Sequence, residues 1–92
     1  MKNAFLLAYV IMDNKSILTA LEEISERLSI KVRYGNISSK GGLCRVYNKY
    51  YIIIDKKAAI NSKIDIIIKS IKKFDLQNIY IPPNIRSIIG EE

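Results

Sequence analysis

The chain has 92 residues, 49% hydrophobic and 26% charged, with no histidine, one cysteine and a formal net charge of +6. This length and composition suit one domain over residues 1–92, and the lack of histidine excludes His-dependent zinc sites and Ser–His or Cys–His nucleophile pairs. The single cysteine favours a reducing cytoplasm over secretion, and the charge, carried mostly by residues 31–92, suits either an anionic partner or a solvated Lys-rich surface.

Residues 4–12, AFLLAYVIM, form an apolar run that is too short to span a membrane and lacks a signal-peptide cleavage site. Residues 1–12 are interpreted either as a packing arm or as an N-terminal extension ahead of a start at Met12. Exposed apolar arms are a liability in water, so we predict a homodimer rather than a monomer in which the run folds back on its own helices. The expected interface residues are Phe5, Leu6, Leu7, Tyr9, Val10 and Ile11.

The stretch NKSILTALEEISERLSI, residues 14–30, predicts a helix because one apolar stripe recurs at steps of three and four: Ile17, Leu21, Ile24 and Leu28. Asn14 or Ser16 is the expected N-cap. IKVRYGNI, residues 30–37, then alternates apolar and basic residues, which predicts a half-buried strand. The following NISSKGG is typical of a loop.

LCRVY and YYIII predict a hairpin over residues 43–54, with Asn48-Lys49 as its turn. In the first arm Cys44 shares a face with Val46, and we expect that face to be covered. Cys44 would then be a buried, slowly reacting thiol rather than a catalytic one. The second arm is apolar on both faces, which indicates a central strand or one covered on both sides.

The stretch AAINSKIDIIIKSIKKFD predicts a second helix, with Ser62 and Asp65 as a capping box and one apolar side: Ile60, Ile64, Ile67, Ile68, Ile71 and Phe74. IYIPPNIRSIIG predicts a short helix that begins at Pro83 and closes at Gly90. The chain therefore predicts an α+β fold: a helix, a small mostly antiparallel sheet with the hairpin, a second long helix and a short C-terminal helix.

The segments GGLCR, IDKK and IYIPPNIR resemble motifs of small, uncharacterised bacterial proteins, and this resemblance implies no particular activity. Over residues 16–74 the order helix, strand, Gly-Gly loop, hairpin and helix also resembles the N-terminal half of ImmA/IrrE-type zinc peptidases. In that family the last helix carries H-E-x-x-H, whose histidines bind zinc and whose glutamate activates water. SKIDIIIKSIKKF stands at that place here and contains neither residue type. No ligand or base is therefore carried over.

Aromatic rings alternate with cations in the predicted sheet, as on surfaces that stack bases and hold phosphates, although tyrosine is also an ordinary strand residue. The candidate nucleic-acid-binding residues are Arg33, Arg45, Tyr47, Lys49 and Tyr51. Three aspartates, Asp55, Asp65 and Asp75, are considered as acid–base or metal residues, but each has an ordinary capping or solvation role.

These patterns predict a non-enzymatic accessory or protein-interaction domain of a bacterial cytoplasm, with no catalytic residue, metal or cofactor. Its partner would be a second copy or another protein. The alternative is a small basic nucleic-acid-binding protein, and a cysteine-dependent enzyme is a third interpretation. A continuous basic groove beside exposed tyrosines would favour nucleic acid, whereas a flat apolar patch would favour a protein partner.

Overall fold

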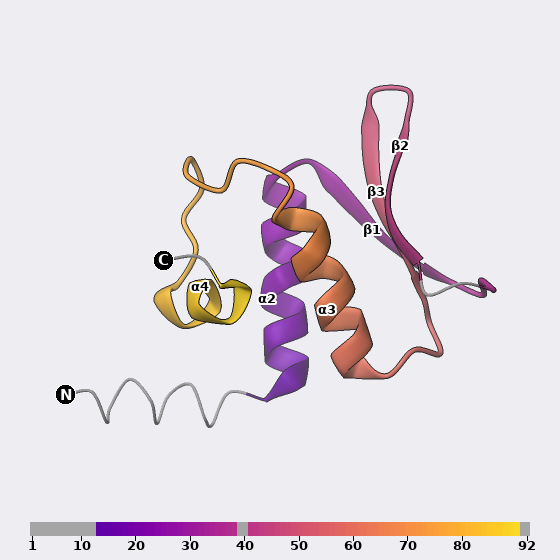
Figure 1. Ribbon diagram of the computed structural model, residues 1–92, viewed down its shortest axis with the longest axis horizontal. Helices are drawn as coiled ribbons and strands as arrows, with labels where there is room; N and C mark the ends of the chain where they lie inside the picture. The colour runs from indigo at the N-terminus through magenta and orange to yellow at the C-terminus, as the bar shows by residue number, and fades with distance from the viewer. Residues whose placement is uncertain (1–12, 39–40, 91–92) are drawn as a thin grey trace.

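The computed structural model describes residues 13–38 and 41–90, which form three helices and one three-stranded sheet (Figure 1). In chain order the elements are α2 (Asn14–Arg27), β1 (Ile30–Gly35), β2 (Gly41–Val46), β3 (Lys49–Asp55), α3 (Ile60–Ile71) and α4 (Pro83–Ile89). The predicted α+β class and the order of its elements are confirmed. No helix within the described ranges is long and apolar enough to cross a membrane.

The elements stack in three layers: the sheet, then α2 and α3 side by side, then α4 on the side away from the sheet (Figure 1). Isoleucine and leucine side chains fill the space between the layers, because each helix turns one apolar stripe inward. The buried core consists of Ile17, Leu21, Ile24, Ile30, Ile52, Ile54, Ile64, Ile67, Ile71, Leu76, Ile81, Ile85 and Ile89.

The apolar stripe of α2 is confirmed, but its N-cap is Asp13 rather than Asn14 or Ser16. The Asp13 carboxylate accepts a hydrogen bond from Ser16 N at 2.8 Å. That bond lowers the pKa of the Asp13 carboxyl, because it favours the ionised form. The helix already includes Asn14, so the cap falls one residue earlier than predicted.

The predicted stripe of α3 is confirmed for Ile64, Ile67 and Ile71, which are buried, whereas Phe74 lies beyond the end of the helix at Ile71. The capping box of Ser62 and Asp65 does not form. The helix begins at Ile60 with Ala59 as its N-cap and no side-chain cap, so Ser62 and Asp65 lie inside it. Asp65 instead forms an exposed ion pair with Lys69 at 3.0 Å. The C-terminal prediction is confirmed: Pro82 is the N-cap of α4, Pro83 its first residue, and Gly90 ends it with φ 94°.

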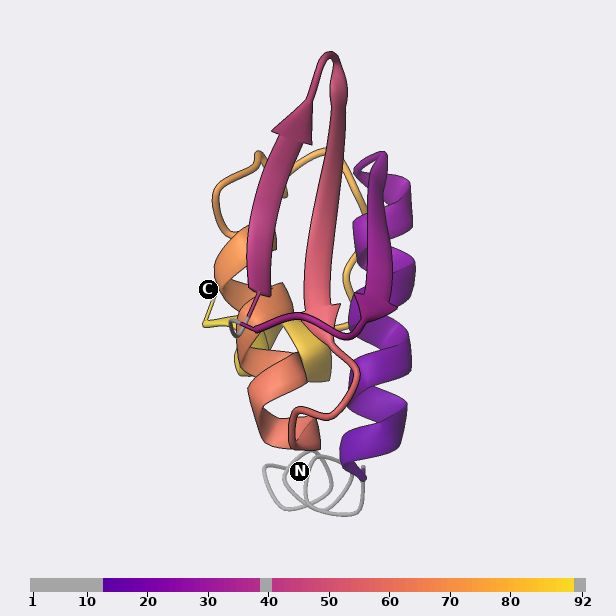
Figure 2. The same ribbon diagram turned by 90° about the vertical axis from the view of Figure 1, so that its right-hand side faces the viewer.

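The sheet is mixed rather than mostly antiparallel. Its strand order is β1-β3-β2, with β1 parallel and β2 antiparallel to β3. β2 begins at the far edge of the sheet from β1, and the hairpin then returns the chain into the middle as β3 (Figure 2). The central position goes to β3, the strand that is apolar on both faces.

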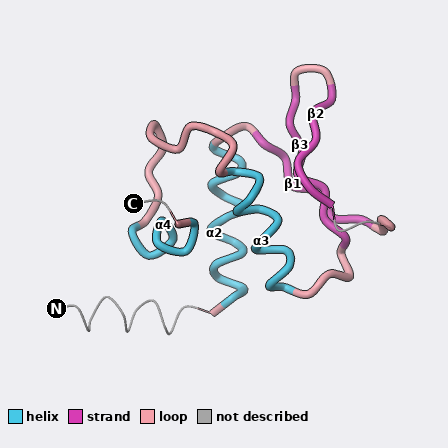
Figure 3. The backbone as a smooth tube through the Cα atoms, in the orientation of Figure 1, coloured by secondary structure: helices cyan, strands magenta, loops and turns pink. Residues whose placement is uncertain are grey.

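The hairpin differs in detail from the prediction. Val46 pairs with Lys49, so the two-residue turn is Tyr47-Asn48 and not Asn48-Lys49. Gly41 and Gly42 belong to β2 instead of the preceding loop. The tip of the hairpin extends past the ends of α2 and α3 (Figure 3), which leaves its side chains beyond the helical layer.

Candidate functional site

The helices all lie behind one face of the sheet, and within residues 13–38 and 41–90 no helix covers the other face (Figure 2). Ile30, Val32, Ile52 and Ile54 point toward the helices and are buried or packed against the core. Side chains alternate along a strand, so their neighbours point the other way. We call this the outer face, and its side chains are Lys31, Arg33, Cys44, Val46, Lys49, Tyr51 and Ile53.

The outer face combines a half-buried apolar centre with exposed cations. Tyr51 and Ile53 on β3 are half-buried, while the cations beside them are exposed. In the register of the sheet Lys31 lies opposite Tyr51 and Arg33 opposite Ile53. Asp55 ends the same row of β3, and its carboxylate accepts a hydrogen bond from Lys57 N at 3.0 Å.

The structure brings together three of the five candidate nucleic-acid-binding residues and separates the other two. Arg33, Lys49 and Tyr51 share the outer face. Arg45 points to the helical side, where its guanidinium carbon lies 5.9 Å from the centroid of the Tyr50 ring. Tyr47 lies in the turn. Lys31 also lies on the outer face and was not predicted, although it alternates along β1 with Val32 in the same way as Arg33.

Tyr47 occupies the hairpin tip in an unfavourable backbone conformation. Its φ is 58°, in the left-handed region that residues other than glycine rarely adopt. The side chain is 91% exposed, so no packing within the described chain explains why a tyrosine is placed there. Its carbonyl oxygen accepts a hydrogen bond from Arg45 Nε at 2.8 Å, and a glycine would retain that bond.

Tyr47→Gly is expected to stabilise the fold by roughly 0.5–1 kcal/mol, because glycine adopts the positive φ without the steric penalty. For a chain of this size that gain corresponds to a rise in melting temperature of about 3–6 °C. Thermal unfolding followed by circular dichroism measures it. Asn48→Gly is the matched control, since Asn48 has no positive φ, and an equal gain there would contradict the explanation.

Cys44 is exposed, so the expectation that it is buried is wrong. The face that Cys44 shares with Val46 is the outer face, whereas the neighbouring Leu43 packs against the core. The predicted alternation of the strand is therefore right, but the covered side is that of Leu43 and not that of Cys44.

We now expect Cys44 to react with a thiol reagent in the native state at a rate within about tenfold of that in denaturant, because accessibility no longer limits the reaction. Absorbance after adding an aromatic disulfide reagent measures both rates. Leu43→Cys combined with Cys44→Ser moves the thiol to the core side and should slow native labelling. Equal rates for the two positions would contradict the assignment of the faces.

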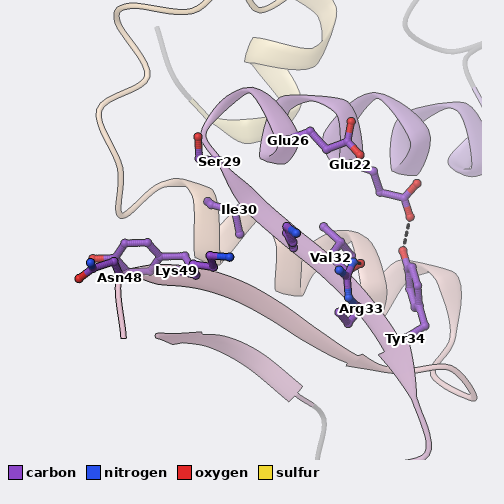
Figure 4. A pocket seen from close by; sticks show the side chains of 11 residues that line it. Glu22, Glu26, Ser29, Ile30, Val32, Arg33, Tyr34, Asn48 and Lys49 are labelled. Atoms are coloured by element: carbon purple, nitrogen blue, oxygen red, sulfur yellow. Dashed lines mark hydrogen bonds between the residues drawn. The ribbon is translucent and has the colours of Figure 1, made fainter. Parts of the chain in front are cut away.

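A groove of about 780 Å³ runs along β1 beside α2. We call it the β1 groove, and its lining residues are Glu22, Glu26, Ser29, Ile30, Lys31, Val32, Arg33, Tyr34, Asn48, Lys49 and Tyr50. Figure 4 shows Glu22 and Glu26 on the helix above the strand, with Asn48 and Lys49 at one end.

The Tyr34 hydroxyl bridges the two walls of the β1 groove by donating a hydrogen bond to the Glu22 carboxylate (Figure 4). Desolvation by burial raises the pKa of Tyr34, and the bond and the charge of Glu22 raise it further. The phenol therefore stays protonated and remains a donor at any physiological pH. Lys63 Nζ lies 5.4 Å from the centroid of the Tyr34 ring.

The three aspartates considered for chemistry lie in separate local contacts. Asp65 pairs with Lys69, Asp75 Oδ1 accepts from Gln77 N at 2.9 Å, and Asp55 is bonded as described above. In the described part of the chain no three His, Cys, Asp or Glu side chains are grouped so that they could hold a metal ion. The predicted dimer interface, Phe5, Leu6, Leu7, Tyr9, Val10 and Ile11, lies outside the described residues.

Comparison of the chain with protein-family models, with curated proteins and with solved structures found no match. The resemblances to small bacterial proteins and to ImmA/IrrE-type peptidases therefore stay predictions from the sequence.

Proposed function

We propose that this chain is a non-enzymatic protein-interaction domain of a bacterial cytoplasm, and that it binds its partner on the outer face of the sheet. The supporting observation is the one-sided arrangement of the helices, which leaves Tyr51 and Ile53 at the centre of a face that no helix of the described residues covers (Figure 2). A mixed apolar and cationic patch of this kind is typical of a binding surface.

Cys44 gives a direct test, because its thiol projects from the same face and pairs across the strands with Tyr51. A photo-cross-linker attached to Cys44 of the full chain is expected to capture a protein in an extract of the native host. The double variant Tyr51→Thr/Ile53→Thr should lose that product, since it removes the apolar centre while threonine, a residue that favours strands, stands at both positions. Capture that is unaffected by this variant would contradict the proposal.

The matched control moves the cross-linker to another surface. Cys44→Ser combined with Gln77→Cys places the only thiol at an exposed position in the segment between α3 and α4. This variant should not form the same product. If it does, the capture does not report on the outer face.

The alternative function is binding of single-stranded nucleic acid, and the cations Lys31, Arg33 and Lys49 around Tyr51 favour it. A basic surface with an aromatic ring is able to hold phosphates and stack one base. Fluorescence anisotropy with a labelled 12-nucleotide single strand tests it at several salt concentrations. Binding with a salt slope that falls by about one on Lys31→Gln would support this alternative.

A second copy of the chain is a further candidate partner, argued from the sequence of residues 4–12. Burial of half of these apolar side chains would contribute several kcal/mol at about 25 cal/mol per Å², and two-fold dimers are the commonest small assemblies. Light scattering of the full chain and of a form without residues 1–11 tests this. A full chain that is monomeric at micromolar concentration would exclude the dimer.

A further inference from the structure

β1 is an edge strand of the described sheet, and one side of its backbone faces the β1 groove. On the opposite side it pairs with β3, and there Gly35 O accepts a hydrogen bond at 2.9 Å from Lys56 N, which directly follows β3. Successive residues of a strand direct their N–H and C=O groups to opposite sides, so the even-numbered residues of β1 face the groove. Val32 O, one of these groups, accepts a long hydrogen bond of 3.4 Å from Arg33 Nη1.

The β1 groove extends along enough of β1 to take a short extended peptide. It follows β1 from Ile30 to Tyr34, which at about 3.3 Å per residue is roughly 16 Å of strand. Glu22 and Glu26 stand on its helical side, and the hairpin residue Asn48 lies at one end (Figure 4). Exposed sheet edges bind peptides by main-chain hydrogen bonds, with alternate side chains providing specificity.

The charges beside this edge select the kind of strand that fits. A strand added to β1 would place every second side chain on the outer face, next to Lys31 and Arg33, with Lys49 near one end of the groove. Opposite charges at neighbouring cross-strand positions are favourable and like charges are not. On the helical side the Glu22 carboxylate is already bonded to the Tyr34 hydroxyl, so uncharged side chains suit that row.

We propose that β1 accepts an extended segment of a partner protein as a fourth strand, with acidic residues at alternate positions and uncharged residues between them. This inference rests on the proposed function, because it names the partner of a protein-interaction domain. Cations on an edge strand also protect a sheet against unwanted pairing. If Lys31 and Arg33 only prevent pairing, an acidic strand does not bind to β1. If they recognise a partner, an acidic strand binds.

The test uses the full chain and a fluorescein-labelled nine-residue peptide in which threonine and glutamate alternate. Fluorescence anisotropy is expected to show binding at least about tenfold tighter than that of the same peptide with lysine in place of glutamate. A third peptide carries proline in place of the central threonine of the glutamate peptide. It keeps the charge, and in a strand that adds antiparallel to β1 it lacks one N–H of the main-chain ladder, so its affinity should fall by about tenfold or more.

Lys31→Glu/Arg33→Glu should weaken binding of the glutamate peptide by roughly tenfold and favour the lysine peptide instead. Both side chains are exposed, so the variant should fold. Lys15→Glu/Lys73→Glu is the matched control, because it changes the net charge equally at exposed positions outside the β1 groove. It should bind the glutamate peptide like the unaltered chain.

The proposal is overturned if the glutamate peptide does not bind, if the lysine peptide binds equally well, or if the proline peptide binds as tightly as the uninterrupted one. If the peptide fails while the Cys44 cross-linker captures a partner, the strand-addition proposal alone is lost. If the peptide does not bind, but a single-stranded oligonucleotide binds in a way that depends on Lys31 and Arg33, the nucleic-acid alternative replaces both the strand-addition proposal and the protein-interaction proposal.

Discussion

Gly41→Ala is expected to lower the free energy of unfolding by about 3 kcal/mol or more. A Cβ atom at this position would lie 1.9 Å from the carbonyl oxygen of Ile53 and 2.9 Å from its carbonyl carbon. Both are backbone atoms of the central strand, so neither moves without breaking the pairing of β2 with β3. The φ of 98° adds strain for any residue with a side chain. Urea denaturation followed by circular dichroism measures the change.

Gly35→Ala is the matched control for this prediction. Gly35 ends β1, and a Cβ atom there would meet nothing within 4 Å. Its φ is not positive, so alanine is expected to change stability by less than about 1 kcal/mol in either direction. Similar losses for the two variants would show that the close approach of β2 to β3 is not the reason for glycine at position 41.

The helices were predictable from the sequence because burial acts on them through a regular spacing. Leu21 in α2 and Ile67 in α3 are both fully buried, as their stripes indicated. The first residue of each helix was harder to predict. Several polar residues lie near each start, and the backbone conformation decides which residue precedes the first turn. Asp13 and Ala59 hold those positions.

The face of β2 that is covered was not predictable from the sequence of the strand. Both faces of β2 carry apolar side chains, with Leu43 on one face and Cys44 and Val46 on the other. Alternation indicates that the two faces differ, but not which of them meets a helix. The pairing of Leu43 with the buried Ile52 decides it, and that register depends on contacts between strands.

The candidate site was also predictable only in part. Arg33, Lys49 and Tyr51 were found because alternation and composition are local properties. The β1 groove was missed, since it depends on the strand order that leaves β1 at an edge and on the position of α2 beside it. Strand order in a mixed sheet follows from long-range pairing, for which a single sequence offers no direct signal.

The short C-terminal helix is expected to be essential to the fold despite its seven residues. Ile85 in α4 is 1% exposed, and α4 packs against α2 on the side opposite the sheet (Figure 1). Ile85→Ala should therefore lower the free energy of unfolding by about 2–5 kcal/mol, the usual cost of removing a large buried side chain and leaving a cavity. Thermal or urea unfolding of the full chain measures it.

Ile88→Ala provides the comparison that isolates burial, because residue type, helix and substitution are the same. Ile88 is only partly buried at the edge of the core, so its loss should be clearly smaller than that of Ile85. Both variants share the same change in helix propensity, which cancels in the difference. If Ile85→Ala costs no more than Ile88→Ala, α4 does not complete the core, and the second layer formed by α2 and α3 must be stable with its outer side uncovered.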